Sequence, residues 1–317
     1  FDGAINQLDK DLERHIKEYL AVRCGMQEIF SYPWMEESYV NAILQSTDGI
    51  LALSTPPSPS ERFIRASLLP NLCRAVAKNE RYYGDFAIFE TAQVFRDENY
   101  TAPYDEREKL PSQRKNVAGA FVSAGKDVTG LFRRAKGVVE MMPRYTHMEP
   151  YSFRQVSKPV WADEVVWLNI YLGEEYIGDL ALLSKRVSMA CGIKNVNVML
   201  FQLDQDALIP LRSRTNSFRH LAEYPMTDYD ISLLLDGQVK WADVAQTIGG
   251  IKNPLLHGAA FVDEYRGKQV PEGKKSLTAR LTIGSAEKTL TSAEIEEVAN
   301  SVLKKLAKRF GAELRSR

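Results

Sequence analysis

The residues best suited to chemistry lie near the end of the chain, in a stretch between two apolar runs. Residues 261–277 combine two glycines and a proline with a cluster of cations. Cations of this kind can hold phosphates, and an aromatic ring can stack on an unpaired base of single-stranded RNA. The candidate RNA contacts are Tyr265, Arg266, Lys268, Lys274, Lys275 and Arg280. The alternative to RNA contact is that Lys274 and Lys275 are solvated residues of a hairpin and that Tyr265 packs in a sheet.

Other reactive residue types form no recognisable constellation. The four histidines have neither HExxH nor two-His spacing, so they predict no metal site; they are His15, His147, His220 and His257. The cysteines are scattered without paired spacing, which favours a reducing compartment over a disulfide framework or zinc site; they are Cys24, Cys73 and Cys191. Residues 119–125 lack the GK[ST] ending of a phosphate-binding loop.

The elements that must position the cationic stretch form a complete small domain. Apolar, branched runs predict strands at residues 228–235, 260–265, 276–283 and 312–314. Helical spacing predicts helices at residues 241–248 and 291–309. The second helix has acids in its first turn and cations in its last, which matches the helix dipole. The order is βαββαβ, the ferredoxin-like arrangement.

The first two hundred residues predict a different α+β domain. Apolar periodicity indicates helices at residues 8–20, 67–81 and 128–142, and strands at 27–32, 86–95, 117–123, 164–172, 176–182 and 198–203. Because strands outnumber helices and hairpins dominate, we expect an antiparallel sheet flanked by helices. The predicted domains are residues 1–206 and 221–317, joined by a linker at 207–220.

Composition excludes several classes of protein. The 317 residues are 44% hydrophobic and 26% charged, as in an ordinary globular protein. Lys plus Arg equals Asp plus Glu at 41 each, so any RNA binding must depend on local patches. No apolar run approaches ~20 residues, so no membrane span is expected. The chain begins with Phe1 and lacks a signal-peptide pattern, and we interpret it as a piece of a longer polypeptide.

Several segments together resemble one family. Residues 261–277, with Arg280-Leu281-Thr282 after them, look like the ferredoxin-fold anticodon-binding domain that ends bacterial phenylalanyl-tRNA synthetase β subunits. Residues 25–32 resemble the first class II motif of that subunit. Residues 64–72 (IRASLLPNL) and 89–96 (FETAQVFR) are similar to its arginine-serine-leucine-leucine-proline segment and to its second-motif strand.

The resemblance implies a class II synthetase-like domain without an active site. Class II synthetases use one arginine from the second motif and another from a glycine-rich third motif. Arg96 stands at the first position, whereas residues 184–200 carry only Gly192 and no such arginine. We therefore expect no catalytic residue and no bound cofactor in this chain.

The resemblance also implies a function. The chain would be the noncatalytic C-terminal part of a cytoplasmic β subunit in an α2β2 ligase. It would brace the α subunit, which activates phenylalanine with ATP and Mg²⁺, and it would bind tRNA(Phe). The alternative is a freestanding paralogue that acts as a structural or RNA-binding module. An independent class II ligase is disfavoured by the absent third motif.

Overall fold

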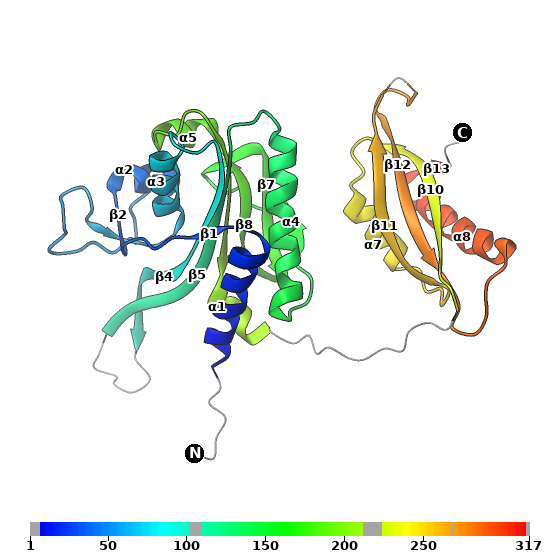
Figure 1. The fold of residues 1–317 in the computed structure, drawn as a ribbon, viewed down its shortest axis with the longest axis horizontal. Helices are drawn as coiled ribbons and strands as arrows, with labels where there is room; N and C mark the ends of the chain where they lie inside the picture. The colour runs from blue at the N-terminus through cyan, green and yellow to red at the C-terminus, as the bar shows by residue number, and fades with distance from the viewer. Residues whose placement is uncertain (1–6, 102–108, 212–223, 268, 315–317) are drawn as a thin grey trace, which may run out of the picture. The chain divides into compact units, whose positions relative to one another are not determined.

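The chain divides into two compact units, residues 1–216 and 217–317 (Figure 1). The computed structural model describes residues 7–101, 109–211, 224–267 and 269–314. The first residues of the predicted linker are helical, in α6 (Gln205–Leu208) and a 3-10 turn (Ile209–Leu211). Leu208 is buried in the core of the first unit, which therefore extends past residue 206. The rest of the predicted linker, residues 212–220, lies outside the described residues.

The first unit is built on a seven-stranded sheet in the order β1-β4-β5-β9-β8-β7-β6. Its strands are β1 (Gln27–Glu28), β4 (Asp85–Thr101), β5 (Lys109–Ser123), β6 (Ser152–Arg154), β7 (Ala162–Leu172), β8 (Glu175–Leu183) and β9 (Asn197–Asp204). Only the β1–β4 pair is parallel among these described strands; the other neighbours are antiparallel. The predicted antiparallel sheet flanked by helices is confirmed.

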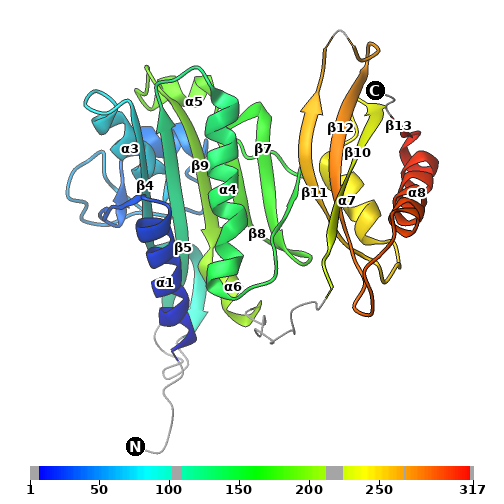
Figure 2. The ribbon, with the colours of Figure 1, turned by 45° about the vertical axis from the view of Figure 1, so that its right-hand side comes forward.

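Helices cover both faces of this sheet. One face packs against α1 (Leu8–Glu18), its π-helical continuation (Tyr19–Arg23) and α4 (Val128–Thr146) (Figure 2). The other packs against α2 (Glu37–Ile43), α3 (Leu69–Asn79) and α5 (Lys185–Ala190). Alternation along each strand supplies the two cores: Phe121 and Phe201 lie in the first, while Ala120 and Leu200 lie in the second. A small two-stranded antiparallel sheet, β2 (Trp34–Met35) with β3 (Phe63–Ile64), lies beside α2.

The second unit has the predicted βαββαβ order. Its elements are β10 (Thr227–Asp236), α7 (Trp241–Gly249), β11 (Leu256–Tyr265), β12 (Lys274–Ile283), α8 (Ser292–Phe310) and β13 (Glu313–Leu314). The antiparallel sheet runs β11-β12-β10-β13. Leu233, Leu277 and Leu281 point from it into the core beneath the two helices. Alternate residues such as Asp230 and Arg280 belong to the opposite face.

The strand predicted at residues 27–32 is too long. Backbone pairing with β4 continues only to Ile29, whose N–H donates to the Phe89 carbonyl at 2.8 Å. The Ser31 N–H donates instead to the carboxylate of Glu90, so the chain leaves the sheet there. A side chain has replaced the backbone as acceptor, which residue patterns alone do not reveal.

Candidate functional site

The structure places most of the predicted RNA contacts at the β11–β12 hairpin. Tyr265 ends β11, and Lys274, Lys275 and Arg280 lie on β12, so the connecting loop is shorter than predicted. Lys268 lies outside the described residues. Tyr265 is 41% exposed. A side chain at Gly267 would collide with the Tyr265 ring, because a Cβ there would lie 2.4 Å from its hydroxyl oxygen, so glycine permits the position of this aromatic ring.

Arg280 is held by an acid on the neighbouring strand. Its Nε and Nη2 donate to Asp230 Oδ1 and Oδ2 at 2.8 and 2.9 Å, a bidentate pair across β12 and β10. These hydrogen bonds lower the pKa of Asp230. Both side chains are exposed, yet the positive charge of Arg280 is already balanced within the domain.

The hairpin cations are likewise paired. Glu264 accepts from Lys275 Nζ and from Arg266 Nε, each at 2.8 Å. Lys275 is only 4% exposed, so it supports the hairpin from inside and cannot reach a ligand without leaving Glu264. Lys274 Nζ lies 3.5 Å from Glu313. The described part of the predicted site is therefore less positive than its sequence indicates.

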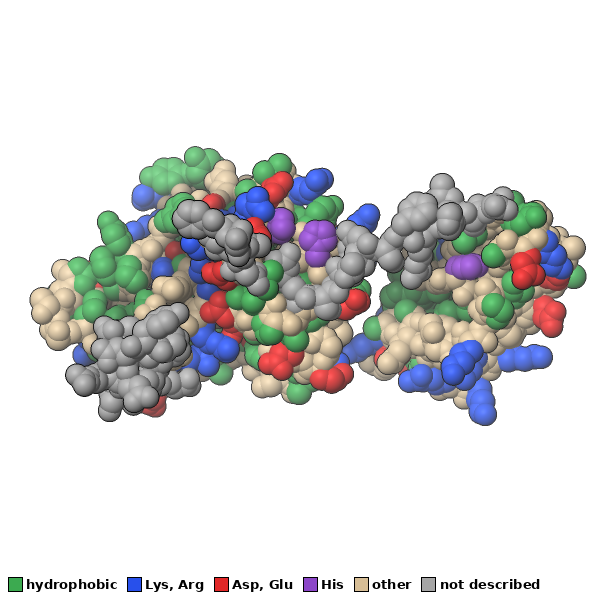
Figure 3. Space-filling view, turned by 90° about the horizontal axis from the view of Figure 1, so that it is seen from below, with side chains coloured by type: hydrophobic (Ala, Val, Ile, Leu, Met, Phe, Trp, Pro, Cys, Tyr) green, Lys and Arg blue, Asp and Glu red, His purple; other side chains and the backbone are tan. Residues whose placement is uncertain are grey.

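A second surface, in the first unit, is aromatic. Phe30 and Tyr32 are 81% and 71% exposed, and the Tyr32 ring stacks on Trp34 with centroids 4.5 Å apart. A pocket of about 610 Å³ opens beside them. Figure 3 shows hydrophobic side chains at the surface over the end of this unit that carries α2 and β2. Large exposed apolar groups gathered in this way are typical of a protein-binding surface.

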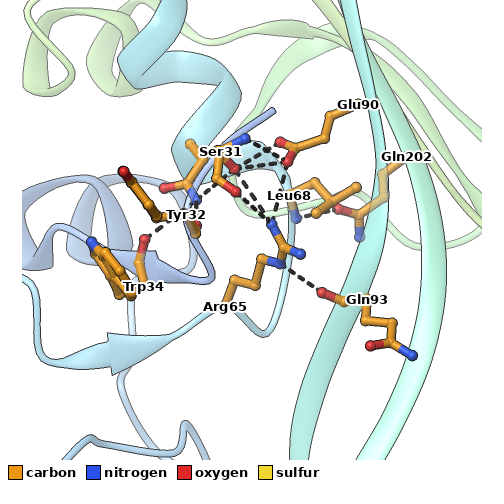
Figure 4. Close-up of polar contacts among 9 residues, drawn as sticks. Ser31, Tyr32, Trp34, Arg65, Leu68, Glu90, Gln93 and Gln202 are labelled. Atoms are coloured by element: carbon orange, nitrogen blue, oxygen red, sulfur yellow. Dashed lines mark hydrogen bonds and ion pairs between the residues drawn. The ribbon is translucent and has the colours of Figure 1, made fainter. Parts of the chain in front are cut away.

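A buried polar network fixes this aromatic segment (Figure 4). Glu90, 2% exposed, accepts from Ser31 N at 2.9 Å and from Ser31 Oγ at 2.8 Å. Arg65 Nη1 lies 3.3 Å from Glu90 Oε1, and Arg65 Nε donates to the Gln93 carbonyl at 2.6 Å. Asn71 Nδ2 donates to Ser31 Oγ and to the Tyr32 carbonyl, both at 3.0 Å. The segment is thus tied to α3 and to β4.

Charge in this network is balanced despite its burial. Burial lowers the pKa of Arg65, and the Glu90 carboxylate opposes that effect. Residue patterns had assigned these side chains no role. The available signal was one charge of each sign inside an apolar run, Arg65 after Ile64 and Glu90 after Phe89. Buried charges of this kind are usually paired.

Arg96 lies at a separate pocket on the sheet face that carries α3. The pocket is about 450 Å³ and is lined by residues that include Arg96, Arg114, Asp179 and Asp204. Arg114 Nη1 pairs with Asp204 Oδ2 at 2.8 Å. Burial raises the pKa of Asp179, although Asn169 and Tyr176 donate hydrogen bonds to it. Two acids and two cations thus line the same pocket.

The fold brings together two cysteines that spacing did not indicate as neighbours. Cys73 on α3 and Cys191 after α5 are free, buried thiols in hydrogen-bond contact. That contact and burial raise the pKa of Cys73. Within the described ranges, no three His, Cys, Asp or Glu side chains are grouped to hold a metal. Nor is any helix in those ranges long and apolar enough to cross a membrane.

Both units match models of known protein families. Residues 3–205 match the model of the phenylalanyl tRNA synthetase beta chain CLM domain. The chain belongs to the phenylalanyl-tRNA synthetase beta chain family. Residues 222–315 match the ferredoxin-fold anticodon binding domain, in agreement with the topology of the second unit.

Individual relatives agree with this family. The chain is 27% identical to the phenylalanine–tRNA ligase beta subunit of Oceanobacillus iheyensis and 28% identical to that of Carboxydothermus hydrogenoformans, over 96% of this chain in each case. It spans 38% of the length of either relative. In fold it is similar to a pyrrolysyl tRNA synthetase, Desulfitobacterium hafniense PylSc, with a TM-score of 0.50 and 14% identity, covering 67% of this chain and 74% of that one.

Proposed function

We propose that this chain is the noncatalytic C-terminal part of a phenylalanine–tRNA ligase β subunit. In this proposal it supports a catalytic α subunit and binds tRNA(Phe) during ATP-dependent aminoacylation, within a cytoplasmic α2β2 assembly. The observation that carries the proposal is the succession of two family matches, residues 3–205 and 222–315, along a single chain. ATP and Mg²⁺ bind at the α subunit.

The first unit has the role of an inactive class II synthetase-like domain. Its largely antiparallel sheet and its fold likeness to a tRNA synthetase support that role. In the pocket beside Arg96, Asp179 and Asp204 offset Arg96 and Arg114. The pocket therefore lacks the excess of positive charge that phosphoryl chemistry needs. Activation of phenylalanine takes place on the partner.

The exposed aromatic segment around Phe30 and Tyr32 is the proposed contact with the α subunit. A rigid aromatic surface loses little conformational entropy on binding, and aromatic residues are enriched at the centres of interfaces. The Ser31–Glu90 and Asn71–Tyr32 hydrogen bonds supply that rigidity. The hairpin of the second unit is the proposed tRNA contact, with Tyr265, Arg266, Lys268, Lys274 and Arg280 near the RNA and Lys275 holding Glu264 in place.

A binding experiment with the α subunit tests the interface. We expect the chain to form a stable complex with the α subunit in analytical ultracentrifugation, and the double variant Phe30→Ser/Tyr32→Ser to lose it. Val165→Ser is the matched control, because Val165 is 75% exposed in the same unit but lies on β7. If the wild-type chain forms no complex, the β-subunit proposal fails and a freestanding paralogue is favoured.

A second experiment tests the absence of catalysis. The chain alone should show no ATP–pyrophosphate exchange in the presence of phenylalanine and Mg²⁺, whereas the α subunit together with the chain should show it. Exchange by the chain alone, abolished by Arg96→Ala, would contradict the noncatalytic proposal.

A further inference from the structure

The second unit carries a group of cations that, unlike the described cations of the hairpin, have no acid partner among the described residues. Lys304, Lys305 and Lys308 are exposed on the C-terminal half of α8, and no ion pair within the described residues involves them. By contrast, Arg266, Lys274, Lys275, Arg280 and Lys288 are each paired with an acid. Among the described cations of the second unit, the group of neighbouring lysines without an acid partner therefore lies on α8, whereas Lys252 stands by itself after α7.

Helix geometry places these lysines on one side of α8. Lys308 follows Lys305 by three residues and Lys304 by four, so the side chain of Lys308 has each of the other two as a neighbour about 5–6 Å away at Cβ. Val302 and Leu306 are buried on the opposite side of the helix, in the domain core. Like charges at this spacing destabilise a helix. No acid stands three or four residues from any of the three lysines to offset that repulsion.

The helix dipole explains only part of this arrangement. It favours cations in the last turn, and its effect falls off beyond that turn. Lys308 and Arg309 lie in the last turn, but Lys304 and Lys305 lie one turn earlier. Arg309 also rests against the Phe310 ring, 5.4 Å from its centroid. The helix dipole does not offset the repulsion among Lys304, Lys305 and Lys308, and no nearby acid does so. Binding of a polyanion would relieve this repulsion.

We propose that Lys304, Lys305 and Lys308 form a contact surface for the phosphate backbone of RNA. Lysine acts on phosphate as a point charge and carries no base specificity. The described outer face of this helix half offers no exposed aromatic ring for base stacking, so the contact is to phosphates. This surface lies on the helix-covered side of the sheet, whereas Arg280 lies on the opposite side. The inference rests on the proposed tRNA-binding function.

Salt dependence of binding tests this surface. The experiment compares the full chain with the variant Lys304→Gln/Lys305→Gln/Lys308→Gln, using tRNA(Phe) transcript as the ligand. Glutamine has nearly the helix propensity of lysine, so α8 should persist, and circular dichroism checks this. Because each phosphate contact contributes about 0.7–0.9 to the slope of log K against log salt, the slope should become shallower by about 2. If the variant and the wild type bind equally at 1 M salt, this slope difference makes the variant bind roughly a hundredfold more weakly than the wild type at 0.1 M salt.

A charge-matched control separates a local contact from a change in net charge. Lys78→Gln/Lys126→Gln/Lys194→Gln removes three exposed lysines from the first unit and should leave the slope unchanged. An unchanged slope in the α8 variant, or an equal change in the control, overturns the inference while tRNA binding itself stands. If the wild-type chain shows no tRNA binding at all, the tRNA part of the proposed function fails and the inference fails with it.

Discussion

Arg65 and Glu90 form a buried ion pair, with Arg65 Nη1 3.3 Å from Glu90 Oε1, next to the exposed aromatic segment that carries Phe30 and Tyr32. The same carboxylate accepts hydrogen bonds from Ser31, so one side chain both neutralises Arg65 and ends the β1 pairing. The buried Arg65–Glu90 pair thus fixes the position of the exposed aromatic segment through Ser31.

Loss of Glu90 should therefore lower the stability of the first unit. Glu90→Ala leaves Arg65 buried without its acid, and breaking a buried pair in this way costs about 3–5 kcal/mol. Urea unfolding of the chain measures that loss. Glu164→Ala is the control, because Glu164 belongs to an exposed pair with Lys158 and should change stability by less than about 1 kcal/mol. Equal losses in the two variants would contradict the structural role of Glu90.

Lys275 should behave as a structural residue and not as a surface cation. Lys275→Ala removes a buried side chain and its hydrogen bond to Glu264, at an expected cost of about 1–3 kcal/mol. The loss should be confined to the second unit, as hydrogen exchange of β12 amides would show. Lys274→Ala, which removes the half-buried neighbour with only a 3.5 Å pair, should cost much less.

The ion pair between Lys275 and Glu264 should also make the stability of the second unit depend on pH. Burial raises the pKa of Glu264, but hydrogen bonds from Lys275 and Arg266 outweigh it and leave the pKa lowered. A carboxyl whose pKa is lower in the folded state stabilises the fold above its unfolded pKa, and this stabilisation is lost as pH falls through the folded pKa. In Lys275→Ala the acid-range loss of stability should be smaller than in the wild type. Parallel acid-denaturation curves for the two proteins would contradict this.

The fold followed from the sequence more completely than the site did. Hydrophobic periodicity predicted the βαββαβ unit because each buried face repeats every two or 3.6 residues. The same pattern cannot show which acid a lysine meets. Lys275 meets Glu264 across a hairpin, and Cys73 meets Cys191 across more than a hundred residues. Such contacts depend on register and topology, which local patterns do not determine.

Thiol reactivity should report the burial of the cysteine pair. Cys24 is half-buried, whereas Cys73 and Cys191 are buried in the second core of the first unit. Burial raises the pKa of Cys24, and the contact with Cys191 together with burial raises the pKa of Cys73, whereas the hydrogen bond from Cys73 lowers the pKa of Cys191. The thiolate fraction therefore does not set the order of alkylation, and access of the reagent to the half-buried thiol before the two buried ones should set it. Iodoacetamide labelling followed by mass spectrometry should modify Cys24 first, and Cys73 and Cys191 only on unfolding. Labelling of Cys73 at the rate of Cys24 in the folded chain would contradict the packing of α3 on the sheet.

The capping box of α8 should contribute stability that depends on pH. Glu294 accepts from the Thr291 N–H at 2.8 Å and pairs with Lys288, and hydrogen bonds, first from Lys288 and then from Thr291, lower its pKa to about 2. Its contribution is complete above the unfolded pKa of about 4.3 and disappears as pH falls through about 2. Glu294→Gln retains the hydrogen-bonding pattern of the box but removes the charge. The variant should therefore melt below the wild type at pH 7 and close to it at pH 2, as calorimetry of the second-unit transition can measure.

Glu297→Gln, which changes an exposed acid of the same helix, is the control, and its melting temperature should differ less between the two pH values relative to the wild type. A Glu294→Gln deficit that is the same at both pH values would show that the charge of this carboxylate does not stabilise the helix start.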